Sequence, residues 1–237
     1  MNVQDRIIVA LDTDDPDEAI DIVYDLKDFA GMFKVGSELF TSNGPLIVER
    51  IVSAGLKVFL DLKYHDTPNT VSKSVAEAAK LGVDLISVHL SSGEKCLKAA
   101  MANKGRSRLF GVTVPTSIGE DECYRIYGRS REKQVFHLGL LAANSGLDGI
   151  ICAGNSHEAG QIKQDPRFQN LQILCPGIRL SSDQKHDQYA TVDPIDAIKN
   201  GADYIVLGRT ITQHRHTAAH LGKKEIINAM IKTALKM

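Results

Sequence analysis

The sequence predicts an α/β protein, a single (β/α)8 TIM barrel that extends over residues 1–237. Two observations lead to this prediction: short apolar runs recur eight times, and stretches with helical periodicity lie between them. Near-continuous apolar strands that alternate with helices are typical of a parallel sheet covered on both faces. Eight such units in a chain of 237 residues fit a closed barrel better than an open, doubly wound sheet.

The eight expected strands are rich in Val, Ile and Leu, and several end in a glycine or a charged residue. In chain order they are residues 6–12, 32–38, 57–63, 85–90, 108–114, 148–154, 171–177 and 204–209. Between them, residues 16–30, 69–82 and 193–201 show the apolar spacing of amphipathic helices. No linker or low-complexity segment divides the chain, so the sequence predicts one domain.

Two tripeptides hint at internal repetition. Gly82-Val83-Asp84 and Gly201-Ala202-Asp203 both come directly before an expected strand, where a glycine is typical of a helix end. A GxGxxG motif, which would indicate dinucleotide binding, does not follow the first expected strand. The dinucleotide-binding version of an α/β fold therefore lacks support.

Composition and charge argue against several classes of protein. The formal net charge is -1, and no run of Lys and Arg is interleaved with aromatic residues, so we expect no nucleic-acid partner. No stretch approaches the roughly 18 apolar residues of a membrane span, and the N-terminal residues do not resemble a signal peptide. Four scattered cysteines lack CxxC spacing, which predicts buried free thiols and a cytoplasmic location: Cys96, Cys123, Cys152 and Cys175.

The stretch FLDLKYHDTPNT, residues 59–70, places four charged or titratable side chains at the end of an expected strand. A solvated polar loop explains most short charge clusters. Here the apolar neighbours carry the charges into or beside the core, where an unpaired charge is costly. Asp61 and Lys63 are two residues apart, so they share one face of a strand and can neutralise each other. The stretch is therefore a candidate active site.

Other polar residues fall at or just after the carboxyl ends of the expected strands, which is where barrel enzymes place their chemistry. They are Asp12, Lys34, His89, Thr113 and Thr116. Each has a structural alternative when taken alone; Asp12, for example, could cap the following helix. A parallel barrel would bring all of them to one rim, and this convergence favours a functional site.

The last two expected strands carry a second signal. Pro176-Gly177-Ile178-Arg179 follows the seventh strand, and Gly208-Arg209 follows the eighth. Glycine lets an oxyanion approach backbone N–H groups, and a nearby Arg can bind it through two hydrogen bonds. Barrels often bind phosphate after their last strands. The two motifs together predict a phosphorylated ligand.

These motifs resemble those of the bacterial orotidine 5′-phosphate decarboxylase family. The matching pieces are ALD at 10–12, KVG at 34–36, DLKYHDTPNT at 61–70, VTVPTS at 112–117, PGIR at 176–179, DQ at 187–188 and VLGR at 206–209. The resemblance implies a cofactor-free, homodimeric (β/α)8 barrel with shared active sites. It also implies the conversion of orotidine 5′-phosphate to UMP and CO2, the last step of de novo pyrimidine synthesis.

The resemblance further implies a role for each matching residue. Lys63 would be the proton donor to C6 as CO2 leaves, and Asp61 would face the substrate carboxylate. Lys34 would pair with Asp61 on one side, and Asp66 would arrive from the partner subunit. These four side chains would form an array of alternating charge.

The remaining positions would hold the rest of the substrate. Asp12 and Lys34 would bind ribose hydroxyls, with Thr70 helping from across the dimer interface. Thr116 would lie near the pyrimidine. The phosphate end would be bound by Arg179, Gln188, Gly208 and Arg209.

The chain departs from the family pattern at a few positions. The family usually has Arg, Ile, Leu and Pro where this chain has Ala190, Thr67, Pro115 and Thr210, respectively. None of these replaces a residue that carries the expected chemistry, although loop closure over the phosphate could differ. Two DQ pairs occur after PGIR, so Gln184 remains the alternative to Gln188.

Two rival functions share parts of the pattern. Related sugar-phosphate enzymes use Mg²⁺ and typically carry an acidic ligand where this chain has Lys34, whose charge would repel the ion. A non-catalytic, phosphate-binding barrel would need neither Lys63 nor Asp61. We therefore expect a metal-free enzyme.

The other histidines are expected to be structural. His89 ends an apolar strand, where a hydrogen-bonded histidine of the core or rim is commoner than a metal ligand. Three more follow the last strand with HxH spacing but without a cysteine or acidic cluster, which favours a solvated segment over a metal site: His214, His216 and His220.

Overall fold

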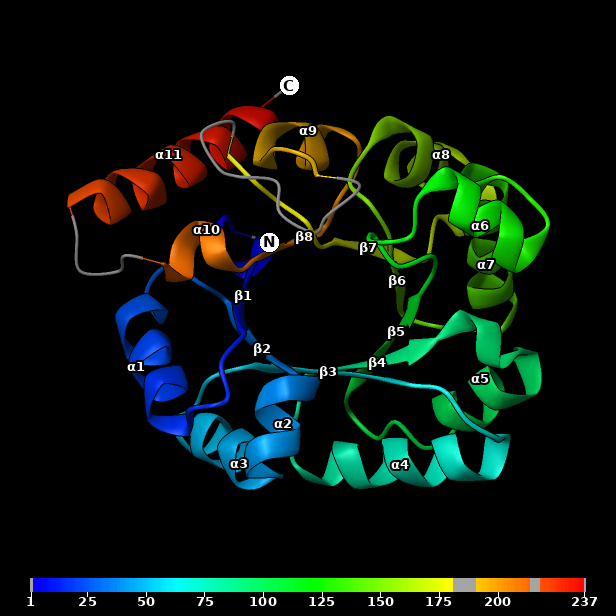
Figure 1. The fold of residues 1–237 in the computed structure, drawn as a ribbon, viewed down its shortest axis with the longest axis horizontal. Helices are drawn as coiled ribbons and strands as arrows, with labels where there is room; N and C mark the ends of the chain where they lie inside the picture. Colours follow the sequence, from blue (N-terminus) through cyan, green and yellow to red (C-terminus); the bar gives the residue numbers. More distant parts are fainter. Residues whose placement is uncertain (1, 181–190, 214–217, 237) are drawn as a thin grey trace.

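The computed structural model describes residues 2–180, 191–213 and 218–236, and its strands form a closed parallel barrel (Figure 1). The strands are β1 Ile7–Leu11, β2 Met32–Gly36, β3 Val58–Tyr64, β4 Leu85–His89, β5 Arg108–Val112, β6 Gly149–Ile151, β7 Gln172–Cys175 and β8 Tyr204–Leu207. Each strand pairs in parallel with the next, and β8 pairs with β1 to close the ring. The predicted (β/α)8 fold class is confirmed.

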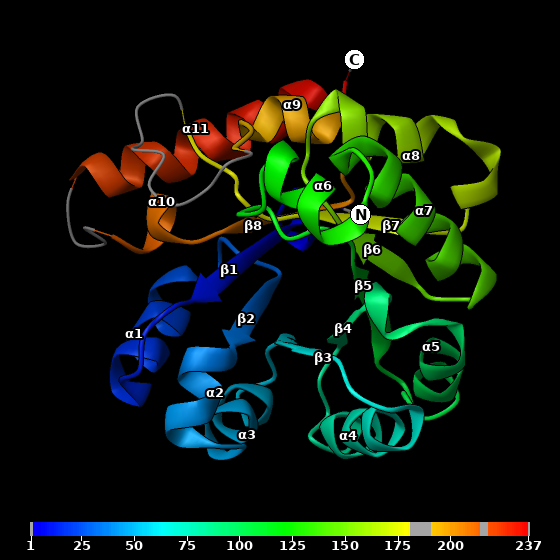
Figure 2. The same cartoon turned by 45° about the vertical axis from the view of Figure 1, so that its right-hand side comes forward.

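Helices surround the barrel (Figures 1 and 2). They are α1 Pro16–Leu26, α2 Ser37–Asn43, α3 Leu46–Ser53, α4 Pro68–Lys80, α5 Glu94–Met101, α6 Glu120–Tyr127, α7 Arg131–Asn144, α8 Gln161–Gln164, α9 Pro194–Lys199, α10 Arg209–Thr212 and α11 Ala218–Ala234. Short turns of other helix types are η1 Gln4–Arg6, η2 Leu90–Ser92, η3 Ser156–Gly160 and η4 Pro166–Phe168. The three stretches predicted to be helical correspond to α1, α4 and α9.

Several expected strands extend too far at their carboxyl ends. The sequence prediction continued the sixth and seventh strands to residues 154 and 177, whereas β6 and β7 end at Ile151 and Cys175. The apolar character continues past the last ladder hydrogen bond because the first loop residues also pack against the core. These loops form the rim that carries the site.

The barrel walls separate two apolar layers, which explains why the strands read as continuous apolar runs. Inside the barrel lies a cluster that includes Ile8, Phe59, Phe110, Leu174 and Tyr204. A larger cluster fills the space between the strands and the helices. All four cysteines are free and buried, as predicted.

The repeated tripeptides have a shared structural purpose. Their glycines adopt positive φ at the helix ends. Each aspartate comes directly before one strand and accepts a hydrogen bond from a backbone N–H group of the preceding strand in the barrel. A third copy, Gly146-Leu147-Asp148, also does this. The hydrogen bonds are Val58 N to Asp84 Oδ2 (3.1 Å), Leu109 N to Asp148 Oδ2 (2.7 Å) and Ile173 N to Asp203 Oδ2 (2.9 Å). The predicted repetition is thus a device that aligns β3 with β4, β5 with β6, and β7 with β8.

The helices of the described residues can be compared with membrane-spanning helices in length and hydropathy. No helix there combines the length and the apolar character needed to cross a bilayer.

Candidate active site

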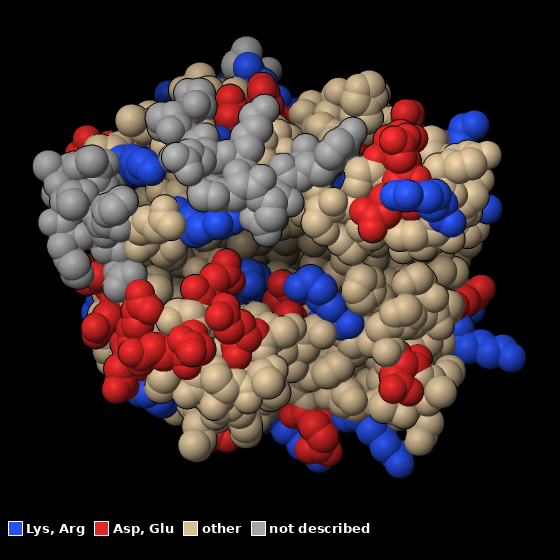
Figure 3. Space-filling model, viewed as in Figure 1, with Lys and Arg blue, Asp and Glu red and all other residues tan. Residues whose placement is uncertain are grey.

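Four charged side chains meet at the carboxyl ends of the first three strands. Lys63 Nζ lies 2.8 Å from Asp61 Oδ2, and Lys34 Nζ lies 3.8 Å from the same oxygen. Lys34 Nζ also donates a hydrogen bond to Asp12 Oδ1 at 3.1 Å. Parallel pairing of β1, β2 and β3 brings these residues together, and Asp61 and Lys63 do share one face of β3. Figure 3 shows basic and acidic side chains around a hollow at the centre of this face.

Asp61 is the buried centre of the array. It is 6% exposed, whereas the Lys63 side chain is 43% exposed. Burial alone would raise the pKa of Asp61, but Lys34, Lys63 and a hydrogen bond from Ser87 together hold this pKa below its usual value. Asp61 is therefore ionised at neutral pH, and it provides the negative charge that keeps two ammonium groups close together.

The backbone of Lys63 is unusual. Among the described residues outside glycine, only Lys63 has a positive φ, of 52°. The register between β3 and β4 shifts between Leu60 and Tyr64, so Lys63 lies within an irregular part of this strand pair. A lysine in the left-handed region costs energy that the surrounding fold must offset, and such strain is typical of functional sites.

Ser87 is a site residue that the sequence interpretation missed. Its hydroxyl donates a hydrogen bond to Asp61 Oδ1 at 2.8 Å and accepts one from Lys63 N at 2.9 Å. Ser87 is completely buried in the middle of β4. The signal was a serine in the middle of the apolar run LISVHL, which the sequence interpretation treated only as part of a strand.

Two neighbouring cavities open beside the array. The first, of about 300 Å³, is lined by Lys34, Phe59, Asp61, Lys63, Val112, Val114, Pro115, Thr116, Ser117, Ile151, Cys152, Leu174, Pro176 and Val206. The second, of about 500 Å³, is lined by Ala10, Asp12, Lys34, Glu38, Pro176, Gly177, Arg179, Val206, Gly208 and Arg209. Lys34, Pro176 and Val206 line both cavities. The two spaces are of the size that small ligands fill, and they suit a ligand with two chemically different ends.

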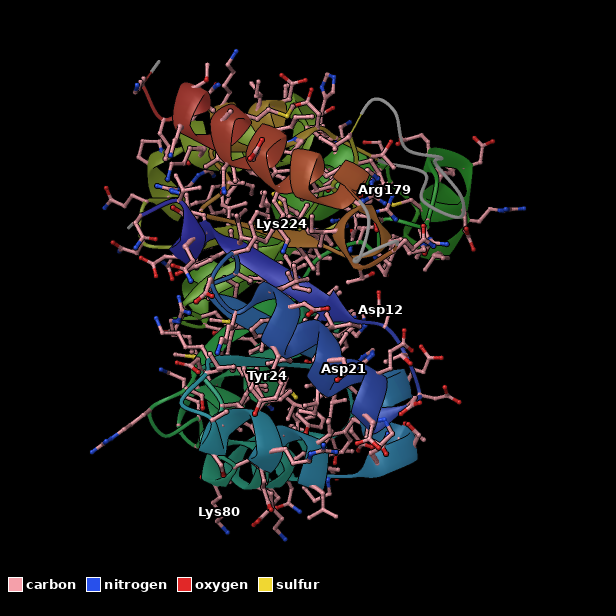
Figure 4. All side chains as sticks on the ribbon, turned by 90° about the vertical axis from the view of Figure 1, so that its left-hand side faces the viewer. Asp12, Asp21, Tyr24, Lys80, Arg179 and Lys224 are labelled. Carbon is pink, nitrogen blue, oxygen red and sulfur yellow. The ribbon has the colours of Figure 1, made fainter. Side chains whose placement is uncertain are left out.

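The predicted binding residues divide between the two cavities. Thr116 lies in the first cavity with the charge array, whereas Arg179 and Gly208-Arg209 lie in the second with Asp12. Figure 4 shows Asp12 and Arg179 at the same end of the barrel. The structure thus brings together residues predicted from six different strand ends.

Thr113 and Thr210 lie beside the site, but their hydroxyl groups form hydrogen bonds within the fold. The Thr113 hydroxyl is buried and donates to Ile151 O at 2.8 Å, so it joins β5 to β6 and does not reach the rim. Thr210, one of the departures from the family pattern, is buried and donates to Ile178 O at 3.4 Å. That contact links the loop after β8 to the Pro176–Arg179 segment.

Asp66 does not join the array through its own chain. Its carboxylate accepts a hydrogen bond from Thr67 N at 2.5 Å, and this contact holds the pKa of Asp66 below its usual value. Asp66 and Thr70 are both exposed at the start of α4, where the Thr67 and Thr70 hydroxyls lie 3.1 Å apart. Both residues are therefore accessible to a second molecule.

His89 and His65 form a pair next to Lys63. Their ring centroids are 5.4 Å apart, and His89 ends β4 as a half-buried residue of the rim. Burial, with the positive charges of His65 and Lys63, lowers the pKa of His89. Within the described ranges, no group of three or more His, Cys, Asp or Glu residues is arranged to hold a metal ion.

Some predicted positions fall where the structure gives no description. They are Gln184, Gln188, Ala190, His214 and His216, together with the side chain of His220. Their expected roles remain predictions.

Known proteins share this arrangement of motifs and fold. A family profile described as "Orotidine 5′-phosphate decarboxylase / HUMPS family" matches residues 5–223. The chain belongs to this family. A protein of Legionella pneumophila strain Philadelphia 1, named orotidine 5′-phosphate decarboxylase, is 44% identical over 214 residues, which are 88% of this chain and 92% of that protein. The family resemblance stated from the sequence motifs is confirmed.

Solved structures of the orotidine 5′-phosphate decarboxylase family have the same fold. The enzyme of Lactobacillus acidophilus is similar over 96% of this chain and 99% of its own, with a TM-score of 0.79 and 29% identity. The enzyme of Methanocaldococcus jannaschii, complexed with the inhibitor BMP, covers the same shares with a TM-score of 0.74 and 25% identity. The fold of this chain is therefore the fold of the family to which its sequence assigns it.

Proposed function

We propose that this protein decarboxylates orotidine 5′-phosphate to UMP and CO2, in de novo pyrimidine synthesis and without a cofactor. The observation that carries the proposal is the Lys63 ammonium held 2.8 Å from the buried Asp61 carboxylate at the wall of the first cavity. Family membership and the names of relatives that cover nearly the whole chain support the same reaction.

Lys63 would supply the proton that the reaction needs. When the bond between C6 and the carboxylate breaks, its electron pair remains on C6 and CO2 leaves. The Lys63 ammonium stabilises this developing negative charge and then transfers a proton to C6, which forms UMP. The lysine, which is partly exposed, afterwards regains a proton from water.

Asp61 would act on the leaving carboxylate. As a buried, ionised group it repels the substrate carboxylate, and this repulsion falls as CO2 departs. Asp61 also forms ion pairs with Lys63 at 2.8 Å and with Lys34 at 3.8 Å. The same carboxylate would therefore act on the substrate and position the two lysines.

The second cavity would hold the ribose and phosphate. Asp12 and Lys34, which are hydrogen-bonded to each other, would bind the ribose hydroxyls. Arg179 and Arg209 offer guanidinium groups beside the backbone of Gly208, a combination that suits a phosphate. Gln188 would complete the phosphate end. Binding energy from this remote end can support the chemistry at C6.

A homodimer would complete each site in this proposal. Asp66 and Thr70 are exposed at the start of α4, which supports their contribution to a partner's site. A cytoplasmic location remains a prediction that rests on the four unpaired cysteines.

The Mg²⁺-dependent branch of the family is the second candidate. It would need an acidic ligand at the position of Lys34, whose ammonium instead lies between Asp12 and Asp61. A cation in that place opposes binding of a divalent ion. Turnover of orotidine 5′-phosphate that persists in the presence of EDTA would favour the metal-free reaction.

Loss of orotidine 5′-phosphate absorbance, followed with purified protein, tests the proposal. Wild type should consume the substrate, and Lys63→Ala should show no measurable turnover because the proposal assigns the proton transfer to C6 to Lys63 alone. The variant should keep its circular dichroism spectrum and still bind UMP. Inactive wild type would refute the function, whereas near-normal turnover by Lys63→Ala would refute only the role of Lys63.

A further inference from the structure

Arg131 uses all of its hydrogen-bonding capacity in one place. It begins α7, is 5% exposed, and lies outside both cavities. An Arg side chain has five N–H donors, and Arg131 makes five hydrogen bonds with them. The acceptors are Glu158 Oε1 (2.6 Å), Glu158 Oε2 (3.4 Å), Pro115 O (2.8 Å), Ile118 O (2.6 Å) and Val114 O (3.1 Å).

Three of these acceptors belong to one loop. Residues 113–119 join β5 to α6, and four consecutive residues of this loop, 114–117, line the cavity that contains Lys63 and Asp61. Pro115 O also accepts a turn hydrogen bond from Ile118 N at 3.0 Å. The loop lies outside the strands and helices, and the guanidinium supplies further donors to its carbonyl groups. The path of the loop past the cavity therefore depends on Arg131.

The other arm of Arg131 reaches the next strand. Glu158 is 3% exposed, and its Oε2 accepts a hydrogen bond from Ala153 N at 3.0 Å, just past the end of β6. Cys152, the residue before Ala153, lines the same cavity. Arg131 and Glu158 thus connect two segments of the cavity wall, one after β5 and one after β6.

Stability alone is a poor explanation for this network. The loss of hydration by a buried ion pair offsets much of its attraction, so such pairs contribute little net stability compared with apolar residues. They can, however, select one conformation among several. A segment that faces a reactive site is where such selection has a functional consequence.

We propose that Arg131 is a positioning residue that holds the 113–119 loop in the conformation that presents Thr116 to the pyrimidine end of the substrate. This inference rests on the proposed decarboxylase function. Lysine at this position would keep the positive charge beside Glu158 but could not bind three divergent carbonyls and a carboxylate with its three donors. The shape of the guanidinium, rather than its charge, does the positioning.

Steady-state turnover of orotidine 5′-phosphate by Arg131→Ala and Arg131→Lys tests this inference. Both variants should lose kcat/KM by about 10- to 100-fold, the size of effect expected when a site group moves by about 1 Å. Arg131→Lys retains the buried charge pair, so it answers the question even if Arg131→Ala does not fold. A wild-type kcat/KM in folded Arg131→Lys would overturn the proposal.

Arg108→Met is the matched control. Arg108 begins β5 at the opposite end of the barrel, where its Nη1 donates to Gln172 Oε1 at 2.9 Å and to the Tyr204 hydroxyl at 2.5 Å. Its loss should lower the melting temperature but leave kcat/KM within about twofold of wild type, since it touches no cavity residue of the site. If equal losses of melting temperature bring equal losses of kcat/KM in Arg108→Met and the Arg131 variants, Arg131 is only structural.

Two further readouts separate positioning from general damage. Guanidinium ion at millimolar concentration should restore part of the activity of Arg131→Ala and none of that of Lys63→Ala. The effects of Arg131→Lys and Thr116→Ala should also be non-additive, because both act through one loop. Full additivity together with absence of rescue would overturn the proposal. Inactive wild type, by contrast, would overturn the decarboxylase function itself.

Discussion

Ser87 shows how a small buried hydroxyl can support two charged residues at once. Its hydroxyl donates a hydrogen bond to the carboxylate of Asp61 and accepts one from the strained backbone of Lys63. Removal of the hydroxyl would take this partner from both Asp61 Oδ1 and the Lys63 N–H group. Hydrogen bonds to charged groups contribute about 1.5–3 kcal/mol. Ser87 therefore supports both the charge and the position of the array.

Ser87→Ala should consequently reduce turnover. Loss of about 1.5–3 kcal/mol of positioning corresponds to a decrease in kcat of about 10- to 100-fold. The measurement is steady-state turnover of orotidine 5′-phosphate, combined with urea unfolding. Ser107→Ala is the control, because Ser107 is also buried and donates to Val83 O at 2.6 Å, but it lies at the other end of the barrel. Equal kcat values in the two variants would contradict the assignment.

His89, at the end of β4, lies against His65, which follows β3, and the partial burial of His89 makes the stability of the fold depend on pH. The pKa of His89 is lowered in the folded protein, so below the ordinary value of 6.5 the unfolded chain binds a proton that the folded chain does not. The stability that neutral His89 provides is present above that value. It is lost as the pH falls toward the lowered pKa.

Wild type should accordingly lose more unfolding free energy than His89→Gln between about pH 7.5 and about pH 5.5. The groups that face His89 are His65, Lys63 and Asp61, of which the first two oppose its protonation and the third favours it. Urea unfolding at both pH values measures the difference. Parallel losses in the two proteins would show that His89 does not cause the pH dependence.

The elements themselves were largely predictable from the sequence, whereas part of the site was not. All eight strands were found because apolar periodicity is a local property of each segment. Ser87 and Arg131 were missed because their importance depends on Asp61 and Glu158, which are 26 and 27 residues away. Asp61 and Lys63 were found because two charges inside an apolar strand are anomalous without knowledge of any distant partner.

At the scale of the whole molecule, the position of Asp66 makes a dimer the central question. If each site takes Lys63 from one chain and Asp66 from the other, then Lys63→Ala and Asp66→Ala chains will complement each other. In a mixed dimer one site carries both defects, and the other carries none. Random pairing of equal amounts makes about half of the dimers mixed, so about a quarter of all sites should be intact.

Co-expression of the two variants should therefore recover about a quarter of wild-type activity, although each variant alone is nearly inactive. Differently tagged chains, purified through both tags, verify that mixed dimers form. Activity of the mixed dimers no greater than the mean of the separate variants would exclude a shared site. Asp66 would then act within its own chain.

The left-handed backbone of Lys63 has a consequence for how this sequence can evolve. Glycine adopts a φ of 52° without penalty, whereas other residues lose about 1–2 kcal/mol there, out of a net stability of about 5–15 kcal/mol. Lys63→Gly should thus melt at a higher temperature than Lys63→Ala, as thermal unfolding would reveal, and equal melting temperatures would argue against stored strain. Mutational drift under selection for stability alone would favour glycine at this position. In the proposed function Lys63 is the proton donor, so a lysine at this position would lower stability for the sake of activity.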